Sequence, residues 1–302
     1  MASLRVTQST VAATVLSGLQ LNLARMQAIQ AKMSSGKQLT RPSDSPSGVL
    51  DAMGHRSTIR RLNQQKTNAD DGLGWLGTAD QTLTSALNLV GRARDLAVGA
   101  GNGSLNASDR EAMATEIDGL RASLLGLGNT RYGDRPIFAG TANVTDAYSP
   151  TGTYLGDNGT VERTVGDGAR VTVNLTGTQV FGPPAGGGAT LFDVLSSISA
   201  HLRSPDATQQ AMVNSSDLSA LDAGRTNVQN QLSIVGARYN RIETMKTRAD
   251  DAITTTTQRL SDVEDIDLPK TIMELNLQSV AYQAALAAGS KVVQPSLVDF
   301  LR

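Results

Sequence analysis

Both ends of the chain carry an apolar stripe in which hydrophobic residues recur at alternating spacings of three and four. This spacing places the stripe on one face of an α-helix, and such a narrow stripe is typical of a helix that packs against another helix. The two stripes consist of Leu16, Leu19, Leu23, Met26, Gln30 and Met33, and of Ile272, Leu275, Ser279, Tyr282, Leu286, Gly289 and Val293. They predict that the two ends meet each other, or that each end meets a neighbouring copy.

The composition favours long helices over a compact globular core. A chain of 302 residues is long enough to bury one large core or two to three smaller ones, yet only 3% of its residues are aromatic and 18% are charged. Long slender helices with polar, self-associating surfaces suit this mixture. We therefore expect an elongated, mainly α-helical protein.

The charge balance excludes several classes of partner. Lys and Arg number 27 against 28 Asp and Glu, which gives a formal net charge of -1, and the basic residues are dispersed. We expect no nucleic-acid partner and no anionic membrane partner, because the chain offers neither of them a basic surface. There is no cysteine, so disulfides and thiol chemistry are excluded, and an exported chain would gain stability from assembly.

The first half of the chain predicts three helices. The first runs from about Ser9 to Ser35 and ends at Gly36, and a proline-containing loop or arm covers residues 37–48. A long helix extends from about residue 49 to the glycine-rich break at 99–103. Ser108 and Glu111 predict a capping box that begins a third helix, which continues toward Gly128.

The middle of the chain reads as a small β insert between helical segments. Residues 137–189 are rich in Gly, Thr, Val, Asn and Pro, and the alternating runs 161–165 and 170–175 predict two strands. Helical signals return at Thr190, and the strongest periodicity of the chain extends from Val228 to Val263. This long helix needs a partner of similar length, and residues 49–98 supply it in antiparallel orientation.

The predicted organisation is symmetric about the insert. We expect an N-terminal assembly and export helix at 1–40, a helical rod formed by 41–136 and 190–265, the β-rich insert at 137–189, and a C-terminal assembly segment at 266–302. Within this last segment, the helix begins after a short break at 267–269. The predicted rod core consists of Leu73, Leu76, Leu83, Leu87, Val90, Val228, Leu232, Val235, Tyr239, Ile242, Ile253 and Leu260.

No catalytic or cofactor site can be assembled from the sequence. His55 and His201 lack any metal-ligand spacing, and we interpret both as surface or packing residues. The carboxylate pairs at 70–71 and 250–251 lie on adjacent helical residues that project about 100° apart, which favours a solvated face or ion pairs with Arg248 or Lys66. The glycine clusters at 99–103 and 186–188 lack the lysine of a phosphate-binding loop and are interpreted as a turn and a linker. We expect no enzyme, cofactor or metal.

The uncharged stretch between Arg5 and Arg25 predicts neither a cleaved signal peptide nor a membrane span. Ser, Thr, Gln and Asn interrupt it too often for a continuous apolar segment. If the protein is exported, another route is implied.

Several motifs resemble the flagellin superfamily. Residues 34–48, SSGKQLTRPSDSPSG, resemble the stretch that follows the first helix in flagellins and their junction relatives, and 70–80 and 235–243 resemble two further family helices. The segments RYGDRPIFAGT at 131–141 and QPSLVDFL at 294–301 resemble the hook–filament junction branch of that superfamily more than flagellin itself.

This resemblance implies a structural adaptor of the bacterial flagellum and no reaction. It implies unprocessed, extracellular delivery through the flagellar type III export path, and termini that stay disordered until assembly. The implied partners are the hook-side junction protein, flagellin, copies of the chain in a ring, and an export chaperone. The expected assembly interface consists of Leu16, Leu19, Leu23, Met26, Met33, Ile272, Leu275, Tyr282, Leu286, Val293, Leu297 and Phe300. The alternatives are flagellin itself and an adhesin or hydrolase displayed through residues 137–189.

Overall fold

The computed structural model describes residues 8–41, 43–101, 105–182 and 189–293. The chain divides into two compact units, of which unit 1 contains Met1–Arg60 and Ile253–Arg302, and unit 2 contains Arg61–Ala252. The described residues are mainly helical, with two small two-stranded sheets and irregular segments between them. The predicted class, mainly α with a small β insert, is confirmed.

Unit 1 is built from helices that begin or end near the predicted positions. Helix α1 spans Gln8–Ser35 and ends at Gly36, whose positive φ of 68° is the left-handed conformation that glycine adopts most readily. Helix α2 spans Pro46–Ala100 and begins three residues before the predicted start, because Ser45 accepts the first backbone bonds and proline suits the first helical turn. Helix α7 spans Leu218–Glu264, and its last turns belong to unit 1. The whole of helix α8 (Leu268–Val293) completes the unit.

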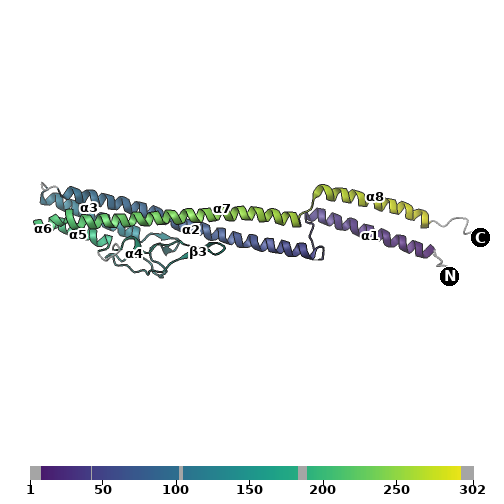
Figure 1. Cartoon of the computed structure of the whole chain (residues 1–302), viewed down its shortest axis with the longest axis horizontal. Helices are drawn as coiled ribbons and strands as arrows, with labels where there is room; N and C mark the ends of the chain where they lie inside the picture. Colours follow the sequence, from purple (N-terminus) through teal and green to yellow (C-terminus); the bar gives the residue numbers. More distant parts are fainter. Residues whose placement is uncertain (1–7, 42, 102–104, 183–188, 294–302) are drawn as a thin grey trace, which may run out of the picture. The chain divides into compact units, whose positions relative to one another are not determined.

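Unit 2 contains the rest of the two long helices, α2 and α7, which lie side by side (Figure 1). Ion pairs join them at three levels: Lys66 to Asp250 at 2.7 Å, Lys246 to Asp70 at 2.6 Å, and Arg94 to Asp222 at 2.6 Å. The expected pairing of residues 49–98 with the long C-terminal helix is present here over the part of α2 that belongs to unit 2. Lys66 is a partner that the sequence named, whereas Lys246 had been interpreted as an interruption of the apolar seam.

Helix α3 (Ala107–Gly128) has a capping box, but other residues form it. Asn106 is the N-cap and accepts a bond from the Asp109 amide at 2.9 Å, while the Asp109 carboxylate accepts one from the Asn106 amide. The predicted Ser108–Glu111 box was wrong by two residues. Asn and Asp satisfy the same two backbone donors as Ser and Glu, so the Ser-x-x-Glu pattern misplaced the cap.

One short hairpin precedes the insert, and a second lies within it. Strand β1 (Arg131–Tyr132) pairs with β2 (Arg135–Pro136), and β3 (Glu162–Gly166) pairs with β4 (Ala169–Thr172), both antiparallel. The second hairpin matches the two predicted strands, with a turn at Asp167 and Gly168. The first precedes residue 137 and was not predicted.

Short helices close the insert and lead into α7. They are α4 (Gly177–Val180), α5 (Leu191–Arg203), α6 (Ala207–Met212) and the π-helical η1 (Val213–Asp217). Thr190 caps α5 as its sequence position suggested. Helix α5 packs on α3, where Arg203 bonds Glu111 and Asp118. Neither α6 nor η1 was predicted.

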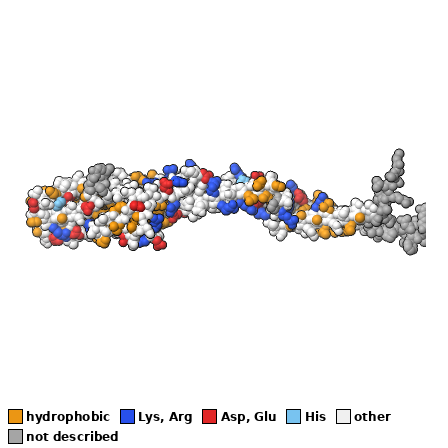
Figure 2. Space-filling model, turned by 90° about the horizontal axis from the view of Figure 1, so that it is seen from below, with side chains coloured by type: hydrophobic (Ala, Val, Ile, Leu, Met, Phe, Trp, Pro, Cys, Tyr) orange, Lys and Arg blue, Asp and Glu red, His pale blue; other side chains and the backbone are white. Residues whose placement is uncertain are grey.

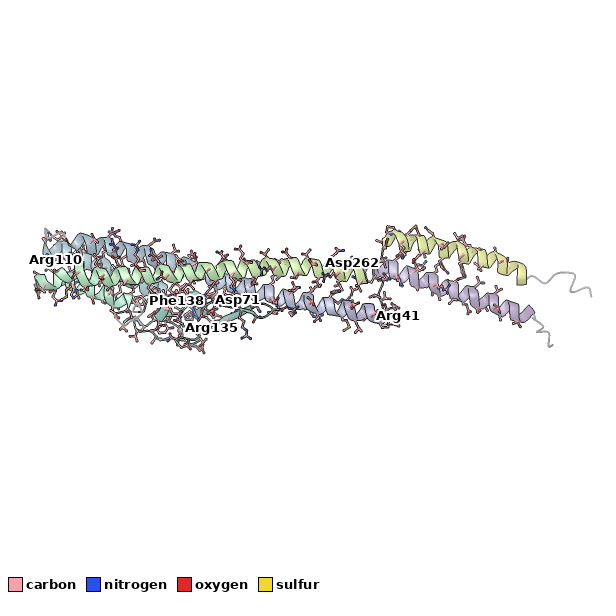
Figure 3. All side chains as sticks on the ribbon, in the orientation of Figure 1. Arg41, Asp71, Arg110, Arg135, Phe138 and Asp262 are labelled. Carbon is pink, nitrogen blue, oxygen red and sulfur yellow. The ribbon has the colours of Figure 1, made fainter. Side chains whose placement is uncertain are left out.

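An aromatic cluster anchors the insert to the helices of unit 2. The Tyr148 ring lies 4.9 Å from the Phe192 ring and 5.9 Å from the Phe181 ring, and Phe181 lies 5.4 Å from Phe138 (labelled in Figure 3). All four rings are buried. Four of the ten aromatic residues of the chain are therefore concentrated in this one place, which explains how a chain poor in aromatic side chains still holds a non-helical insert.

Polar contacts fix the other side of the insert on α2. Asp71, labelled in Figure 3, accepts a bond from Arg163 of β3 at 2.6 Å, and Asn68 donates to the Thr164 carbonyl at 3.0 Å. Asp167 in the β3–β4 turn pairs with Arg61. The carboxylate at residue 71 thus holds the insert, a role that its adjacency to Asp70 did not reveal.

Candidate assembly interface

The end helices α1 and α8 form an antiparallel pair within unit 1 (Figure 1). Their less exposed positions follow spacings of four and three along each helix. This is the pattern of a coiled-coil seam. The seam consists of Val15, Leu19, Asn22, Met26, Ile29 and Met33 on α1, and of Thr271, Leu275, Gln278, Tyr282, Ala285 and Gly289 on α8.

Small and polar residues give this seam its register. A Cβ atom added to Gly289 would lie 2.9 Å from Cγ1 of Val15, so the two helices approach closely there. Near the middle, Nε2 of Gln278 donates to Oδ1 of Asn22 at 3.1 Å. A polar pair in a mainly apolar seam favours one alignment of the two helices over others and lowers the stability of the helix pair.

The structure divides the predicted interface residues into two groups. Leu19, Met26, Met33, Leu275 and Tyr282 lie in the seam between α1 and α8. The remaining described members lie outside the seam and are exposed: Leu16, Leu23, Ile272 and Leu286. The side chain of Val293, together with Leu297 and Phe300, lies outside the described residues.

Helix α8 has a second apolar face that the sequence stripe missed. Met273, Leu277 and Val280 are 65%, 72% and 61% exposed, and Ala284 and Ala287 continue their four-three spacing. Figure 2 shows hydrophobic side chains at the surface of the end helices. One face of α8 therefore meets α1, and the other meets nothing within the described part of this single chain. A helix with two apolar faces is expected to pack against a neighbour on each face.

A polar clip joins the segments that lead into and out of the end helices. The Lys37 ammonium contacts Glu264 at 3.2 Å and Asp265 at 2.6 Å, and Arg56 reaches the other oxygen of Glu264 at 2.5 Å. Backbone bonds run from Gln38 to the Glu264 carbonyl and from Ile266 to the Gly36 carbonyl. The bond from Asp265 raises the pKa of the Lys37 ammonium, and the same bond lowers the pKa of the Asp265 carboxyl.

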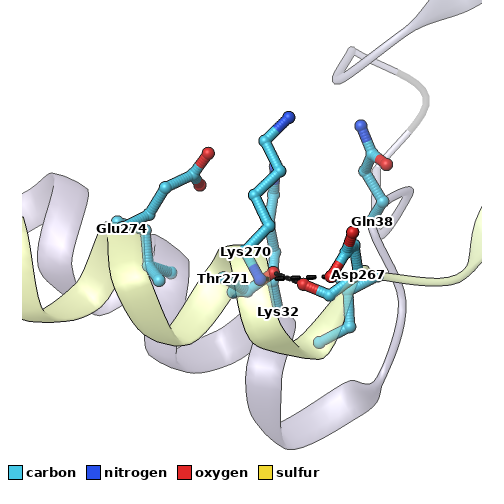
Figure 4. A pocket seen from close by; sticks show the side chains of 8 residues that line it. Lys32, Gln38, Asp267, Lys270, Thr271 and Glu274 are labelled. Atoms are coloured by element: carbon cyan, nitrogen blue, oxygen red, sulfur yellow. Dashed lines mark hydrogen bonds between the residues drawn. The ribbon is translucent and has the colours of Figure 1, made fainter.

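The polar lining of a small pocket beside this clip is explained by the N-terminal capping of α8. It has a volume of about 150 Å³ and is lined by Ile29, Lys32, Gln38, Ile266, Asp267, Lys270, Thr271 and Glu274 (Figure 4). Asp267 accepts the Lys270 amide at 3.1 Å and, through its carbonyl, the Thr271 hydroxyl at 2.8 Å. These bonds satisfy the first turn of α8, so the polar lining has a structural reason.

The predicted rod-core residues occupy three kinds of position. Leu76, Leu83, Val90, Val228, Val235 and Ile242 are buried in the core of unit 2, and Leu73, Leu87 and Leu232 pack partly buried against it. Ile253 and Leu260 belong to unit 1, where they are half-buried. The prediction was wrong for Tyr239, which is 36% exposed and lines a surface groove. The apolar stripe to which Tyr239 belongs drifts around α7, because its average spacing of 3.5 residues differs from the 3.6 residues of one helical turn.

Both histidines lie on helices. His201 lies 2.6 Å from Asp217 and links α5 to η1, and His55 is half-buried on α2. Within the described ranges, no three His, Cys, Asp or Glu side chains are gathered as a metal site would require. None of the helices described here has the length and apolarity needed to cross a bilayer. The glycine cluster at 186–188 lies outside the described residues, as does Gly103.

Comparison with known proteins defines the class. The N-terminal helical region of bacterial flagellin matches residues 6–143, and the C-terminal helical region of bacterial flagellin matches residues 218–301. The chain belongs to the flagellin family, and it is a structural component of the flagellum rather than an enzyme.

Within the family, the similar proteins include a hook-associated protein and a flagellin. Flagellar hook-associated protein 3 of Escherichia coli (strain K12) is 30% identical over 277 residues, which cover 85% of this chain and 87% of that protein. Flagellin of Bacillus subtilis (strain 168) is 26% identical over 314 residues, covering 99% and 100%.

Solved structures share the fold. Flagellar hook-associated protein 3 of Legionella pneumophila has a TM-score of 0.62 at 17% identity, covering 69% of this chain and 98% of that one. FlgL of Bacillus cereus has a TM-score of 0.59 at 21% identity, covering 69% and 99%. These likenesses support the helical framework.

Proposed function

We propose that the chain is a structural adaptor that joins the flagellar hook to the flagellin filament. The name of the E. coli relative, hook-associated protein 3, supports this assignment. The structural observation that carries it is the two-sided α8, because an adaptor needs surfaces left over after its own fold is complete. The proposed partners are the hook-side junction protein, flagellin, further copies in a ring, and a chaperone during export.

The end helices are the proposed joining surface. Burying a Met, Leu or Val side chain that is now exposed contributes roughly 1.5–3 kcal/mol. Met273, Leu277 and Val280 are available for this, as are Leu16 and Leu23 on α1. The seam between the two helices holds polar and small residues, so it is weak by itself, and isolated helices of this length are marginal in water. We infer that α1 and α8 become stably ordered when other subunits cover them.

Complementation tests the adaptor function. In a strain that lacks this protein, we expect hooks without filaments and flagellin released into the medium, and the full chain restores filaments. Removing residues 1–35 or 272–302 is expected to leave a soluble helical fragment without this ability. Filament growth with either truncated form would contradict the proposal.

Two further measurements address ordering and the flagellin alternative. Circular dichroism and limited proteolysis of dilute monomer are expected to show unprotected ends, and ends already protected would overturn the coupling of folding to assembly. The similarity to Bacillus subtilis flagellin makes the second measurement necessary. At high concentration, an adaptor forms short oligomers, whereas long filaments would assign the chain to flagellin.

The proposed export route and location follow the adaptor function. We infer an extracellular position at the junction, reached through the flagellar type III path with the N-terminal segment uncleaved. Intact mass measurement of the protein recovered from detached flagella tests this, and a mass lacking the first residues would contradict it.

A further inference from the structure

Unit 2 has a surface groove between its two long helices that its own fold leaves open. The groove has a volume of about 310 Å³ and is lined by Gly77 and Asp80 of α2 and by Val235, Gly236, Tyr239 and Asn240 of α7. Its floor is the fully buried Val235. All six lining residues belong to unit 2.

Two glycines that face no neighbouring atom help to keep the groove open. A Cβ atom added to Gly77 or to Gly236 would meet nothing within 4 Å. Neither glycine has a positive φ, so neither is required by backbone conformation. Glycine inside a helix costs about 1 kcal/mol relative to alanine. The fold of unit 2 would therefore gain stability from a side chain at either position, which suggests that the space serves a contact with another molecule.

The chemistry of the groove fits an arginine side chain. Asp80 is exposed and has no ion pair within the described part of the chain, and the nearby Lys246 is already paired with Asp70 at 2.6 Å. Tyr239 contributes an exposed aromatic ring, and Asn240 contributes an amide. A carboxylate beside an aromatic face accepts a guanidinium through charge-assisted bonds and a cation–π contact.

The chain offers such a side chain on the opposite face of the same helix. Arg241 is exposed and, in the described residues, has no carboxylate partner. At 3.6 residues per turn it projects roughly 150° from the mean direction of Gly236, Tyr239 and Asn240, at nearly the same height along α7. The half-exposed Ile234 lies one heptad before it on the same stripe. Donor and acceptor thus lie on different sides of one rod at one level.

This arrangement matches a heterologous contact between copies. A contact between unlike patches on opposite sides closes into a ring when repeated by rotation, whereas a twofold contact would need both patches on one side. We propose that Arg241 of one copy enters the groove of the next copy and pairs with its Asp80. The inference rests on the proposed adaptor function and assigns the side-to-side contact within the ring to this groove.

Charge reversal in the full chain tests the contact. Asp80→Arg and Arg241→Asp, each introduced alone, place like charges together, and we expect the fraction of filament-bearing cells in the deletion strain to fall on the order of tenfold. The double variant restores opposite charges between neighbouring copies, and it is expected to recover to within about twofold of the unaltered chain. Trp75 fluorescence and circular dichroism of each purified variant check that unit 2 remains folded.

A matched pair of glycine variants tests the groove by shape. Gly236→Leu fills the groove, whereas Gly119→Leu adds the same side chain to a helical glycine of α3 that also has no atom within 4 Å. Both variants are expected to unfold no earlier than the unaltered chain, and only Gly236→Leu is expected to lose filaments.

The outcomes separate the two proposals. Failure of the unaltered chain to restore filaments would overturn the adaptor function itself. If the unaltered chain restores filaments, then full activity of either single charge variant, no recovery in the double variant, or equal behaviour of the two leucine variants would each overturn the groove contact alone. Recovery in the double variant points to a second copy and not to the hook-side protein or flagellin, because both changes are then in the same chain.

Discussion

The aromatic cluster makes a quantitative prediction about how the insert is held. Phe192 of α5 is fully buried, and its ring lies 4.9 Å from that of Tyr148 and 5.3 Å from that of Phe181. Truncating a buried phenylalanine to alanine destabilises a domain by about 3–5 kcal/mol. Phe192→Leu keeps much of the apolar volume and removes two ring pairs, each worth about 0.5–1.5 kcal/mol, so we expect a loss of about 1–3 kcal/mol.

These free energies convert into measurable shifts of the melting temperature. For a domain the size of unit 2, each 1 kcal/mol lowers the Tm by about 2–4 °C. Phe192→Ala is therefore expected to lower the Tm by roughly 6–20 °C, and Phe192→Leu by roughly 2–12 °C. The only tryptophan of the chain, Trp75, is buried in unit 2, so its fluorescence reports the unfolding of this unit in the full chain.

An exposed residue of the same insert provides the control. Leu155 is 48% exposed, and Leu155→Ala is expected to change the free energy of unfolding by less than about 0.5 kcal/mol. A double-mutant cycle between Tyr148→Leu and Phe192→Leu isolates the ring contact, with an expected coupling of about 0.5–1.5 kcal/mol. A Phe192→Ala shift below about 2 °C, or no coupling in the cycle, would show that the cluster does not anchor the insert.

Three further predictions concern titration and helix packing. Burial raises the pKa of the Tyr148 phenol well above its ordinary value of 10.0. The buried neutral phenol therefore contributes its full stability to unit 2 below pH 10, and this contribution is lost as the pH rises further. The urea midpoint of unit 2 should fall between pH 8 and 11, and it should fall less for Tyr148→Phe. Hydrogen bonds from the Thr141 hydroxyl and amide lower the pKa of Asp157 below 3.8. The contribution of this carboxylate to the stability of unit 2 is therefore present above pH 3.8 and is lost as the pH falls through the lowered pKa. Asp157→Asn should flatten this part of an acid titration followed by Trp fluorescence. A leucine in place of Gly289 would collide with α1, whereas a leucine in place of Gly18 would meet open space. Gly289→Leu should therefore abolish filament restoration in the deletion strain, and Gly18→Leu should preserve it. Equal filament restoration by the two variants would contradict the close approach of α1 and α8.

The periodic helices were the most predictable part of the fold. The three-four spacing located α1, the two long helices and α8, since a continuous apolar stripe depends only on residues near in sequence. Gly36 and Thr190 marked a helix end and a helix start for similarly local reasons. The cap of α3 was misplaced because two overlapping patterns, at Asn106 and at Ser108, each satisfy a capping rule.

The faces of these helices were less predictable than the helices themselves. The stripe on α8 combined seam residues such as Leu275 with exposed ones such as Ile272, because a helix with apolar residues on two sides has no unique stripe. The contact of Asp71 with Arg163 joins residues 92 positions apart, and no local rule connects them. The groove at Gly77 and Gly236 likewise depends on which helices become neighbours, so only the folded structure reveals it.

The double apolar surface of α8 restricts how this part of the chain can change. A helix with one covered side can exchange its outward residues freely, but here Met273, Leu277 and Val280 occupy the outward side. Substitutions that improve solubility of the free subunit would fall on positions that its neighbours require. In a saturation mutagenesis screen for motility, α8 should therefore accept polar replacements along only a narrow strip of its circumference.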